Sequence, residues 1–136
     1  MKEITKKIRI KNKTDLYKKM FVGNEVVEGV QTNYHCCNCT NKNSIKIMPY
    51  DTGRYFGELV SNNVLSKETI LTHKIATQSV RNKHLGELLV NDLPTLYFTT
   101  VCDVCEENYL VVFGIGEKQP SIWLCEVLGV WAYETN

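Results

Sequence analysis

The chain has 136 residues, of which 43% are hydrophobic and 23% are charged, and its net charge is +1. This length and composition are typical of one globular domain over residues 1–136 and exclude a disordered chain. No stretch reaches the roughly 20 apolar residues needed to cross a bilayer, and no apolar core follows the N-terminal lysines as in a secretory signal. We therefore expect a cytoplasmic protein without a membrane segment.

The N-terminal third predicts strands that lead into and away from a first group of cysteines. Residues 7–11 alternate apolar and charged side chains, which indicates a short strand. Thr14 is expected to cap a helical turn that ends at Gly23-Asn24. An extended run over residues 26–34 then enters the cysteines, and an alternating strand over residues 44–48 leaves them before Pro49.

The middle of the chain, about residues 50–93, predicts a helical insertion. Ser66 stands where an N-cap is expected, before a helix that would run to about Val80. A second short helix is expected over residues 83–90, because its leucines fall on one stripe.

The C-terminal third carries the clearest strand pattern. Residues 95–101 are rich in β-formers, and residues 109–115 form a nearly continuous apolar run. Gly114, Gly116 and Pro120 predict a loop, followed by one long strand or two over residues 122–133, bent near Gly129. The expected fold is α+β: a mostly antiparallel sheet built from the N-terminal strand, two cysteine-bearing hairpins (about 28–48 and 95–115) and a C-terminal hairpin.

Two Cys-x-x-Cys pairs form the strongest motif in the sequence. Each pair sits between two predicted strands, and a spacing of two residues lets both sulfurs reach one ion. Soft thiolates in a reducing compartment favour Zn²⁺, or less often iron, and Zn²⁺ takes four of them as a tetrahedron. The predicted metal ligands are therefore Cys36, Cys39, Cys102 and Cys105. Cys37 or His35 is an alternative ligand at the first pair, because both lie next to Cys36.

The two cysteine knuckles and their flanking strands resemble zinc ribbons, in which two β-hairpins each supply one knuckle. The resemblance implies a four-cysteine zinc site that is closed and structural. Two features depart from the zinc-ribbon pattern. Thr40 and Glu106 stand where a glycine often follows the second cysteine, and residues 40–101 separate the pairs, far beyond the usual spacing of about 15–20 residues. The helical insertion accounts for that separation.

Three other interpretations are weaker. A strand followed by Cys-x-x-Cys, as in residues 96–105, is typical of thioredoxin-like redox proteins, but there a helix follows, and here residues 109–113 predict a strand. His73 and His84 show no catalytic zinc motif, and Cys125 is expected to be a buried core thiol. The aromatic residues of the C-terminal strands favour core packing over nucleic-acid stacking.

The charge distribution leaves two kinds of partner open. Residues 1–19 carry eight Lys/Arg and two acids, a net +6, whereas residues 20–136 are at −5. This basic arm is typical of a solvated edge strand and could also contact nucleic acid. No catalytic constellation is found. The favoured function is a non-catalytic, zinc-stabilised protein-interaction domain of accessory or inhibitor (immunity) type. The alternatives are a nucleic-acid-binding accessory protein and a Cys-x-x-Cys redox protein.

Overall fold

The computed structural model describes residues 4, 6–49, 51–119 and 122–135. The strands of the main sheet are β1 (Ile8–Thr14), β2 (Met20–Val22), β5 (Arg54–Tyr55), β8 (Thr95–Val101), β9 (Asn108–Gln119) and β10 (Ile122–Thr135). Antiparallel pairing joins β5 to β8, β8 to β9 and β9 to β10. The other side of β10 pairs with β1 near the end of the strand and with β2 near its start.

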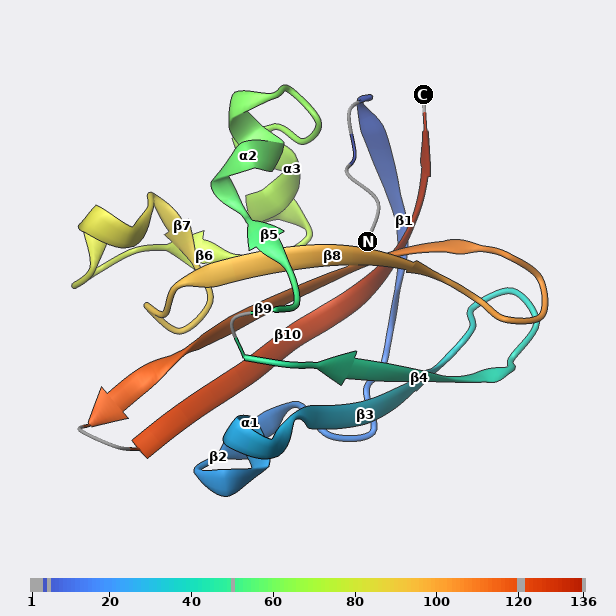
Figure 1. Ribbon diagram of the computed structural model, residues 1–136. Coiled ribbons are helices and arrows are strands. Elements are labelled where there is room, and N and C mark those ends of the chain that lie inside the picture. Colours follow the sequence, from blue (N-terminus) through green and yellow to red (C-terminus); the bar gives the residue numbers. More distant parts are fainter. Residues whose placement is uncertain (1–3, 5, 50, 120–121, 136) are drawn as a thin grey trace.

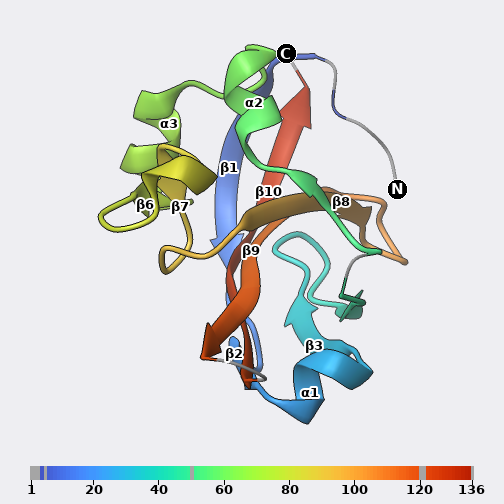
Figure 2. The same ribbon diagram turned by 60° about the vertical axis from the view of Figure 1, so that its left-hand side comes forward.

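The other elements cover the two faces of the main sheet. Figures 1 and 2 show the helical segment and a small hairpin on one side, and the first cysteine hairpin with α1 on the other. Together these elements confirm the expected α+β fold. They are α1 (Asn24–Glu28), β3 (Val30–His35), β4 (Lys42–Ile47), α2 (Gly57–Ser61), α3 (Lys67–Thr72), β6 (Thr77–Gln78), the 3₁₀ turn η1 (Lys83–Leu85) and β7 (Leu88–Leu89).

Strand β9 is apolar from Tyr109 to Phe113 because both of its faces are buried there. Tyr109, Val111 and Phe113 belong to the core beneath the first cysteine hairpin, whereas Leu110 and Val112 belong to the core under α2 and α3. Successive side chains of a strand point to opposite faces, so a sheet covered on both sides needs apolar residues at every position. The cysteines Cys36 and Cys102 are part of the first of these two cores.

Contrary to expectation, the first cysteine hairpin is not part of the main sheet. In the part of the chain that the structure describes, β3 and β4 pair with each other as a separate two-stranded sheet. The alternating side chains of this hairpin are buried on one face only, with Val30, Ile45 and Ile47 packed in the shared core. The hairpin therefore packs face to face against the main sheet instead of extending it.

Two expectations for the N-terminal third are wrong. Thr14 ends β1 and does not cap a helical turn, and α1 occupies the beginning of the run expected to be extended. This helix lies between Gly23 and Gly29, whose φ angles of 66° and 115° are ones that side-chain-bearing residues rarely adopt. The glycines thus allow two sharp turns, and the buried side chain of Val26 fixes the short helix between them.

The helices expected in the middle of the chain are only partly present. The Ser66 hydroxyl caps α3 by accepting from the Thr69 N–H, but this helix ends at Thr72, well before Val80. The helix expected over residues 83–90 is wrong, since only the 3₁₀ turn η1 forms before the strand β7. Leu88 and Leu89 pair with β6 and are buried, so tertiary packing overrides their helical spacing.

The glycines of β9 do not form the expected loop. β9 continues through Gly114 and Gly116, and Pro120 lies outside the described residues. A side chain at Gly114 would place its Cβ 2.7 Å from the carbonyl oxygen of Val90, so the close approach of that segment requires glycine. β10 is one strand with a register shift between Val127 and Gly129, at the expected bend. None of the helices in the described ranges is long and apolar enough to cross a membrane.

Candidate metal centre

Two hairpins bring the four predicted ligand cysteines together at one end of the molecule. The first hairpin, β3–β4, carries Cys36 and Cys39 in its turn, and the second, β8–β9, carries Cys102 and Cys105. All four sulfurs lie within 4.8 Å of one another. Two sulfur contacts between the pairs measure 3.5 Å each, Cys36–Cys105 and Cys39–Cys102.

The two cysteine turns share one backbone geometry, although no glycine follows either pair. In each knuckle the first cysteine donates its N–H to the carbonyl five residues ahead, and its own carbonyl accepts from the residue that follows the second cysteine. That last residue is left-handed in both turns, with φ of 62° at Thr40 and 63° at Glu106. The pairs with their distances are Cys36 N to Asn41 O (2.9 Å), Thr40 N to Cys36 O (3.0 Å), Cys102 N to Glu107 O (3.0 Å) and Glu106 N to Cys102 O (3.0 Å).

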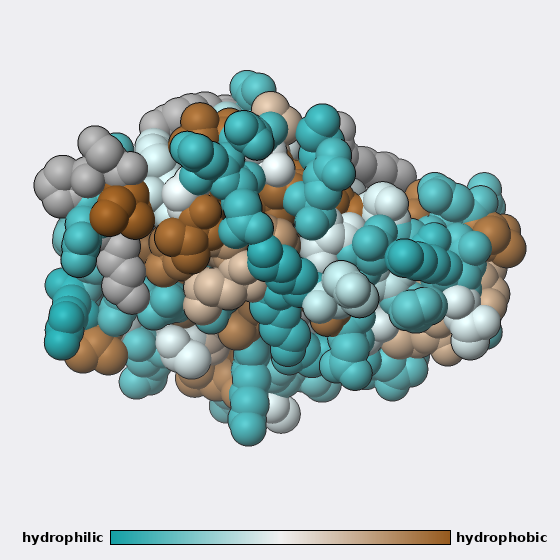
Figure 3. Space-filling view, turned by 90° about the horizontal axis from the view of Figure 1, so that it is seen from below, coloured by the Kyte–Doolittle hydropathy of each residue, from teal (hydrophilic) through white to brown (hydrophobic). Residues whose placement is uncertain are grey.

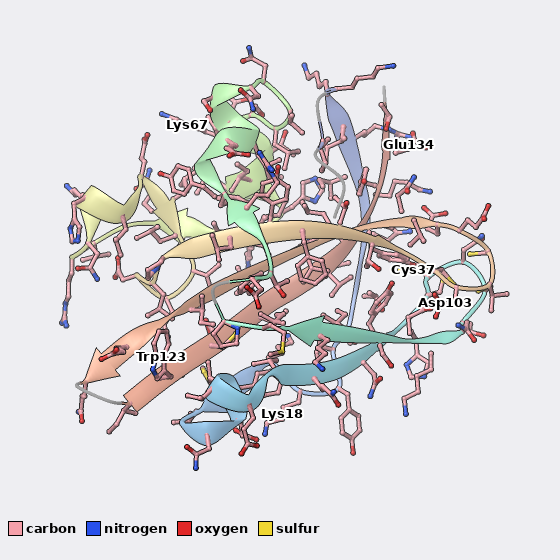
Figure 4. The ribbon with its side chains drawn as sticks, viewed as in Figure 1. Lys18, Cys37, Lys67, Asp103, Trp123 and Glu134 are labelled. Carbon is pink, nitrogen blue, oxygen red and sulfur yellow. The ribbon has the colours of Figure 1, made fainter. Side chains whose placement is uncertain are left out.

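Two side chains connect the knuckles to each other. The Asn43 amide oxygen accepts from the Asp103 N–H at 3.1 Å, and the Tyr109 hydroxyl accepts from the Cys37 N–H at 2.7 Å. Each acceptor lies four residues after the second cysteine of its hairpin, and each donor directly follows the first cysteine of the opposite knuckle. Figure 4 shows Cys37 and Asp103 together at this end of the molecule. The two hairpins are therefore held in register by a reciprocal pair of hydrogen bonds.

Hydrogen bonding to the sulfurs favours the thiolate form of two cysteines. The backbone N–H of Cys105 has the largest influence on Cys102 and, despite burial, the pKa of Cys102 falls to about 6. Burial alone would raise the pKa of Cys36, but hydrogen bonds from the Tyr109 hydroxyl and from two backbone N–H groups outweigh it and lower this pKa. Thiolates are the form that binds a metal ion.

Tyr34 places a second phenol beside the cluster. Its ring centroid is 4.9 Å from that of Tyr109, and the side chain is 1% exposed. Burial, with the charge of the neighbouring Cys102 and Cys36, raises the pKa of Tyr34. Its hydroxyl is buried and has no hydrogen-bond partner among the described residues. A buried hydroxyl of this kind is costly unless an acceptor is supplied.

The geometry of the cluster fits a tetrahedral metal ion. Four sulfurs at roughly 2.3 Å from zinc would be separated by about 3.8 Å along each edge of the tetrahedron. The Cys36–Cys105 and Cys39–Cys102 separations, both 3.5 Å, lie near that edge, and the other four do not exceed 4.8 Å. The four cysteines could therefore hold one metal ion after shifts of no more than about an ångström along any edge.

The other candidate ligands do not join the cluster. Among the described residues, the group that could hold a metal consists of the two pairs alone. His35 and Cys37 are both exposed, because the inward-facing alternation of β3 continues to Cys36. Cys125 is completely buried, and burial raises its pKa to about 12. His73 and His84 are exposed within the insertion between the hairpins.

The surroundings of the cluster differ from those of a redox Cys-x-x-Cys site. Strand β9 begins at Asn108, three residues after Cys105, so no helix follows the second pair. The sulfurs of the two pairs also contact each other, whereas a redox site needs one pair alone. The aromatic side chains considered for stacking are mainly core residues, since Tyr97, Tyr109, Phe113 and Trp131 are buried and Trp123 is partly exposed.

Sequence reasoning missed Asn43 and Tyr109 as parts of this centre. The apolar pattern of residues 109–115 predicts Tyr109 only as a core aromatic, and Asn43 stands among the polar residues of a turn. The signal that could have found both is their shared position, four residues after the second cysteine of each pair. In a hairpin this position is the start of the returning strand, where an inward side chain can reach the opposite knuckle.

Comparisons of this chain with protein-family models, with curated proteins and with solved structures find no match. The interpretation of the centre therefore rests on its geometry.

Proposed function

We propose that this chain is a small non-catalytic domain whose fold is stabilised by one structural Zn²⁺, bound by Cys36, Cys39, Cys102 and Cys105, and that it acts by contacting another protein. The single observation that carries the proposal is the convergence of four cysteine sulfurs within 4.8 Å of one another. A set of four thiolates is the donor set that tetrahedral zinc sites use.

The position of the cluster explains what the ion contributes. The hairpin β3–β4 shares no strand pairing with the main sheet in the described residues and packs on it through one face. An ion held by two cysteines from each hairpin joins these two layers at their open end. Zinc binding by such sites supplies on the order of 10–16 kcal/mol in small zinc peptides, so it would decide whether this hairpin docks.

The donor set supports a structural ion over a catalytic one. Catalytic zinc sites use three protein ligands and keep the fourth position for water or substrate. Here each knuckle provides two sulfurs, and four thiolates complete the shell. The resemblance to zinc ribbons, with two hairpins that each carry a knuckle, supports the same role.

A patch of exposed apolar side chains supports a protein partner. Met20 and Val22 of β2, Val27 of α1 and Ile122 of β10 are between 42% and 56% exposed. These three elements contact one another. Figure 3 shows this side of the molecule as mostly hydrophilic, with apolar residues gathered toward its left-hand end. Grouped apolar side chains on an otherwise polar face are typical of protein-interaction sites, which suits an accessory or inhibitor role.

Metal analysis tests the central part of the proposal. Protein purified without chelator should contain about one zinc per chain, and X-ray absorption at the zinc edge should show four sulfur ligands near roughly 2.3 Å. Folded, reduced protein that neither contains zinc nor takes it up would overturn the proposal. An ion with nitrogen or oxygen ligands would show that the four cysteines do not form the shell.

A second experiment tests the partner class. The variants Val22→Ser and Val27→Ser each replace one apolar side chain of the patch, while Val80→Ser changes a residue that is 75% exposed on the β6–β7 segment. Partner proteins that cross-link to the unchanged chain and to Val80→Ser should no longer cross-link to the patch variants. Equal cross-linking by all four chains would contradict a role of the patch.

A further inference from the structure

We infer that Tyr109 decides which of the adjacent cysteines Cys36 and Cys37 becomes the metal ligand of the first knuckle. This inference rests on the proposed metal site and adds a positioning residue to it. The first knuckle contains three cysteines within four residues, so two spacings toward Cys39 are available. The second knuckle has Asp103 at the position that corresponds to Cys37, and there no such choice exists.

Tyr109 makes two hydrogen bonds that act on this choice. Its hydroxyl donates to the Cys36 sulfur at 3.2 Å and accepts from the backbone N–H of Cys37 at 2.7 Å. The first bond stabilises the Cys36 thiolate. The second holds the Cys36–Cys37 peptide in the orientation in which the Cys37 side chain is exposed. One hydroxyl thereby favours Cys36 as ligand and disfavours the rotation that would bring Cys37 into the cluster.

The position of Tyr109 makes it suited to this role. It lies on β9, on the hairpin opposite to the one it acts on, and its side chain is completely buried in the core with Cys36 and Cys102. The ring of Tyr34 packs against it at 4.9 Å between centroids. Its hydroxyl therefore has a fixed position relative to the main sheet.

Strand alternation also favours Cys36, because β3 buries Val30, Thr32 and Tyr34 and the next inward position is Cys36. Cys37, however, already lies in the turn beyond β3, where no strand pairing fixes its direction. Alternation thus orients Cys36 inward, and the Tyr109 hydroxyl is the contact that orients Cys37. The two effects can be separated by removing this hydroxyl alone.

The experiment maps cysteine alkylation by mass spectrometry in the zinc-loaded full chain, comparing the unchanged protein with Tyr109→Phe. In the unchanged protein, iodoacetamide should modify Cys37 and spare Cys36. In Tyr109→Phe the ratio of Cys36 to Cys37 labelling should rise about tenfold, the effect of one buried hydrogen bond to a charged group. Tyr133→Phe is the matched control, since it removes a largely buried phenol hydroxyl that belongs to the other core.

Two further measurements separate this positioning role of Tyr109 from a general destabilisation of the fold. Cys125 is completely buried, so its labelling reports unfolding and should stay unchanged. In the double variant Tyr109→Phe with Cys37→Ser there is no competing thiol, and Cys36 should be protected again. Two results would overturn this inference but leave the proposed metal site intact. One is an unchanged labelling ratio in Tyr109→Phe, and the other is Cys36 labelling that stays high in the double variant. Failure of the unchanged chain to bind zinc would overturn both the proposed site and this inference.

Discussion

The side chain of Asn43 accepts a hydrogen bond from the backbone N–H of Asp103 at 3.1 Å, across the junction of the two cysteine hairpins. Asn43 is 3% exposed, and its amide N–H₂ group donates to the Asn41 carbonyl at 3.2 Å. The two hairpins are thus connected by a buried amide as well as by the four cysteines. Contacts of this kind orient the ligands around a metal ion.

Asn43→Ala should lower the free energy of unfolding by about 1–3 kcal/mol, because it removes a buried amide and leaves the part-buried Asp103 N–H without its acceptor. It should also weaken zinc affinity by about 10-fold or more, as the second knuckle loses its orientation. Ser44→Ala is the control, since it removes only an exposed hydrogen bond to Asn33 within the same hairpin. Urea unfolding and competition with a zinc chelator measure both effects. Equal behaviour of the two variants would show that the bond contributes nothing.

Zinc binding should require the four predicted ligand cysteines and neither of the other two cysteines, Cys37 and Cys125. Serine at position 36, 39, 102 or 105 should abolish stoichiometric zinc binding and destabilise the fold, because a closed tetrahedral site cannot spare a ligand. Cys37→Ser should keep the zinc, since that side chain is exposed. Cys125→Ala should also keep it while losing roughly 1–3 kcal/mol through a small core void. Zinc lost from Cys37→Ser but kept in Cys36→Ser would place the ligand one residue further along.

The strands near the cysteines could be predicted because their patterns are local. The strand expected over residues 95–101 is confirmed with the same bounds, and the inward alternation of residues 30–36 follows from the sequence. The convergence of the two pairs is expected from the donor chemistry of paired cysteines, which constrains distant segments without any knowledge of the fold.

The elements that could not be predicted depend on contacts between distant segments. Leu88 and Leu89 have helical spacing, but they pair with residues 77 and 78 and become a strand. Val26 is β-branched, yet two glycines with positive φ enclose it in a short helix. The role of Tyr109 depends on a contact with Cys37, 72 residues away in the sequence. Sequence patterns report local preference, and tertiary packing overrides it at these places.

Glycine should suit the knuckle position that Glu106 occupies. Glu106 has a φ of 63°, which is costly for a residue with a Cβ, and the Glu106 side chain is exposed. Glu106→Gly should therefore raise the free energy of unfolding by about 0.5–1 kcal/mol, after allowance for the greater freedom of glycine in the unfolded chain. Glu106→Ala is the control, because it removes the charge but keeps the Cβ, and it should bring no gain. A destabilised glycine variant would show that the left-handed turn is not strained.

Tyr34→Phe should stabilise the zinc-loaded protein by about 1 kcal/mol if the buried hydroxyl stays without an acceptor. Its removal eliminates a desolvated polar group and keeps the ring packed against Tyr109. Tyr109→Phe should have the opposite effect and destabilise the protein, because it removes a hydroxyl that makes two hydrogen bonds. Thermal unfolding at a fixed excess of zinc gives the sign for each variant. A destabilised Tyr34→Phe protein would mean that this hydroxyl donates to a cluster sulfur once the ion is bound.

The basic N-terminal arm separates the proposed protein-interaction role from nucleic-acid binding. Three of its cationic side chains already face acids, in the pairs Arg9–Glu134, Lys11–Glu107 and Lys18–Glu25. These pairs leave fewer free charges for phosphates, and residues 20–136 carry a net charge of −5 that repels a polyanion. Fluorescence titration with single- and double-stranded DNA and RNA should therefore show no binding tighter than roughly 10⁻⁶ M at physiological salt.

The control for that titration uses two sets of five substitutions to glutamine. One set neutralises the arm at Lys6, Lys7, Arg9, Lys11 and Lys13, and the other neutralises Lys42, Lys46, Lys67, Lys74 and Lys83 elsewhere on the chain. A protein that contacts six or more phosphates loses about a thousandfold in affinity between low and near-physiological salt, and such a loss would vanish with the contacts that cause it. Submicromolar, steeply salt-dependent binding that disappears only with the first set would make the arm the functional surface, with the cysteine-bearing sheet as its support. Weak binding that changes equally with both sets would reflect charge alone and agree with a protein partner.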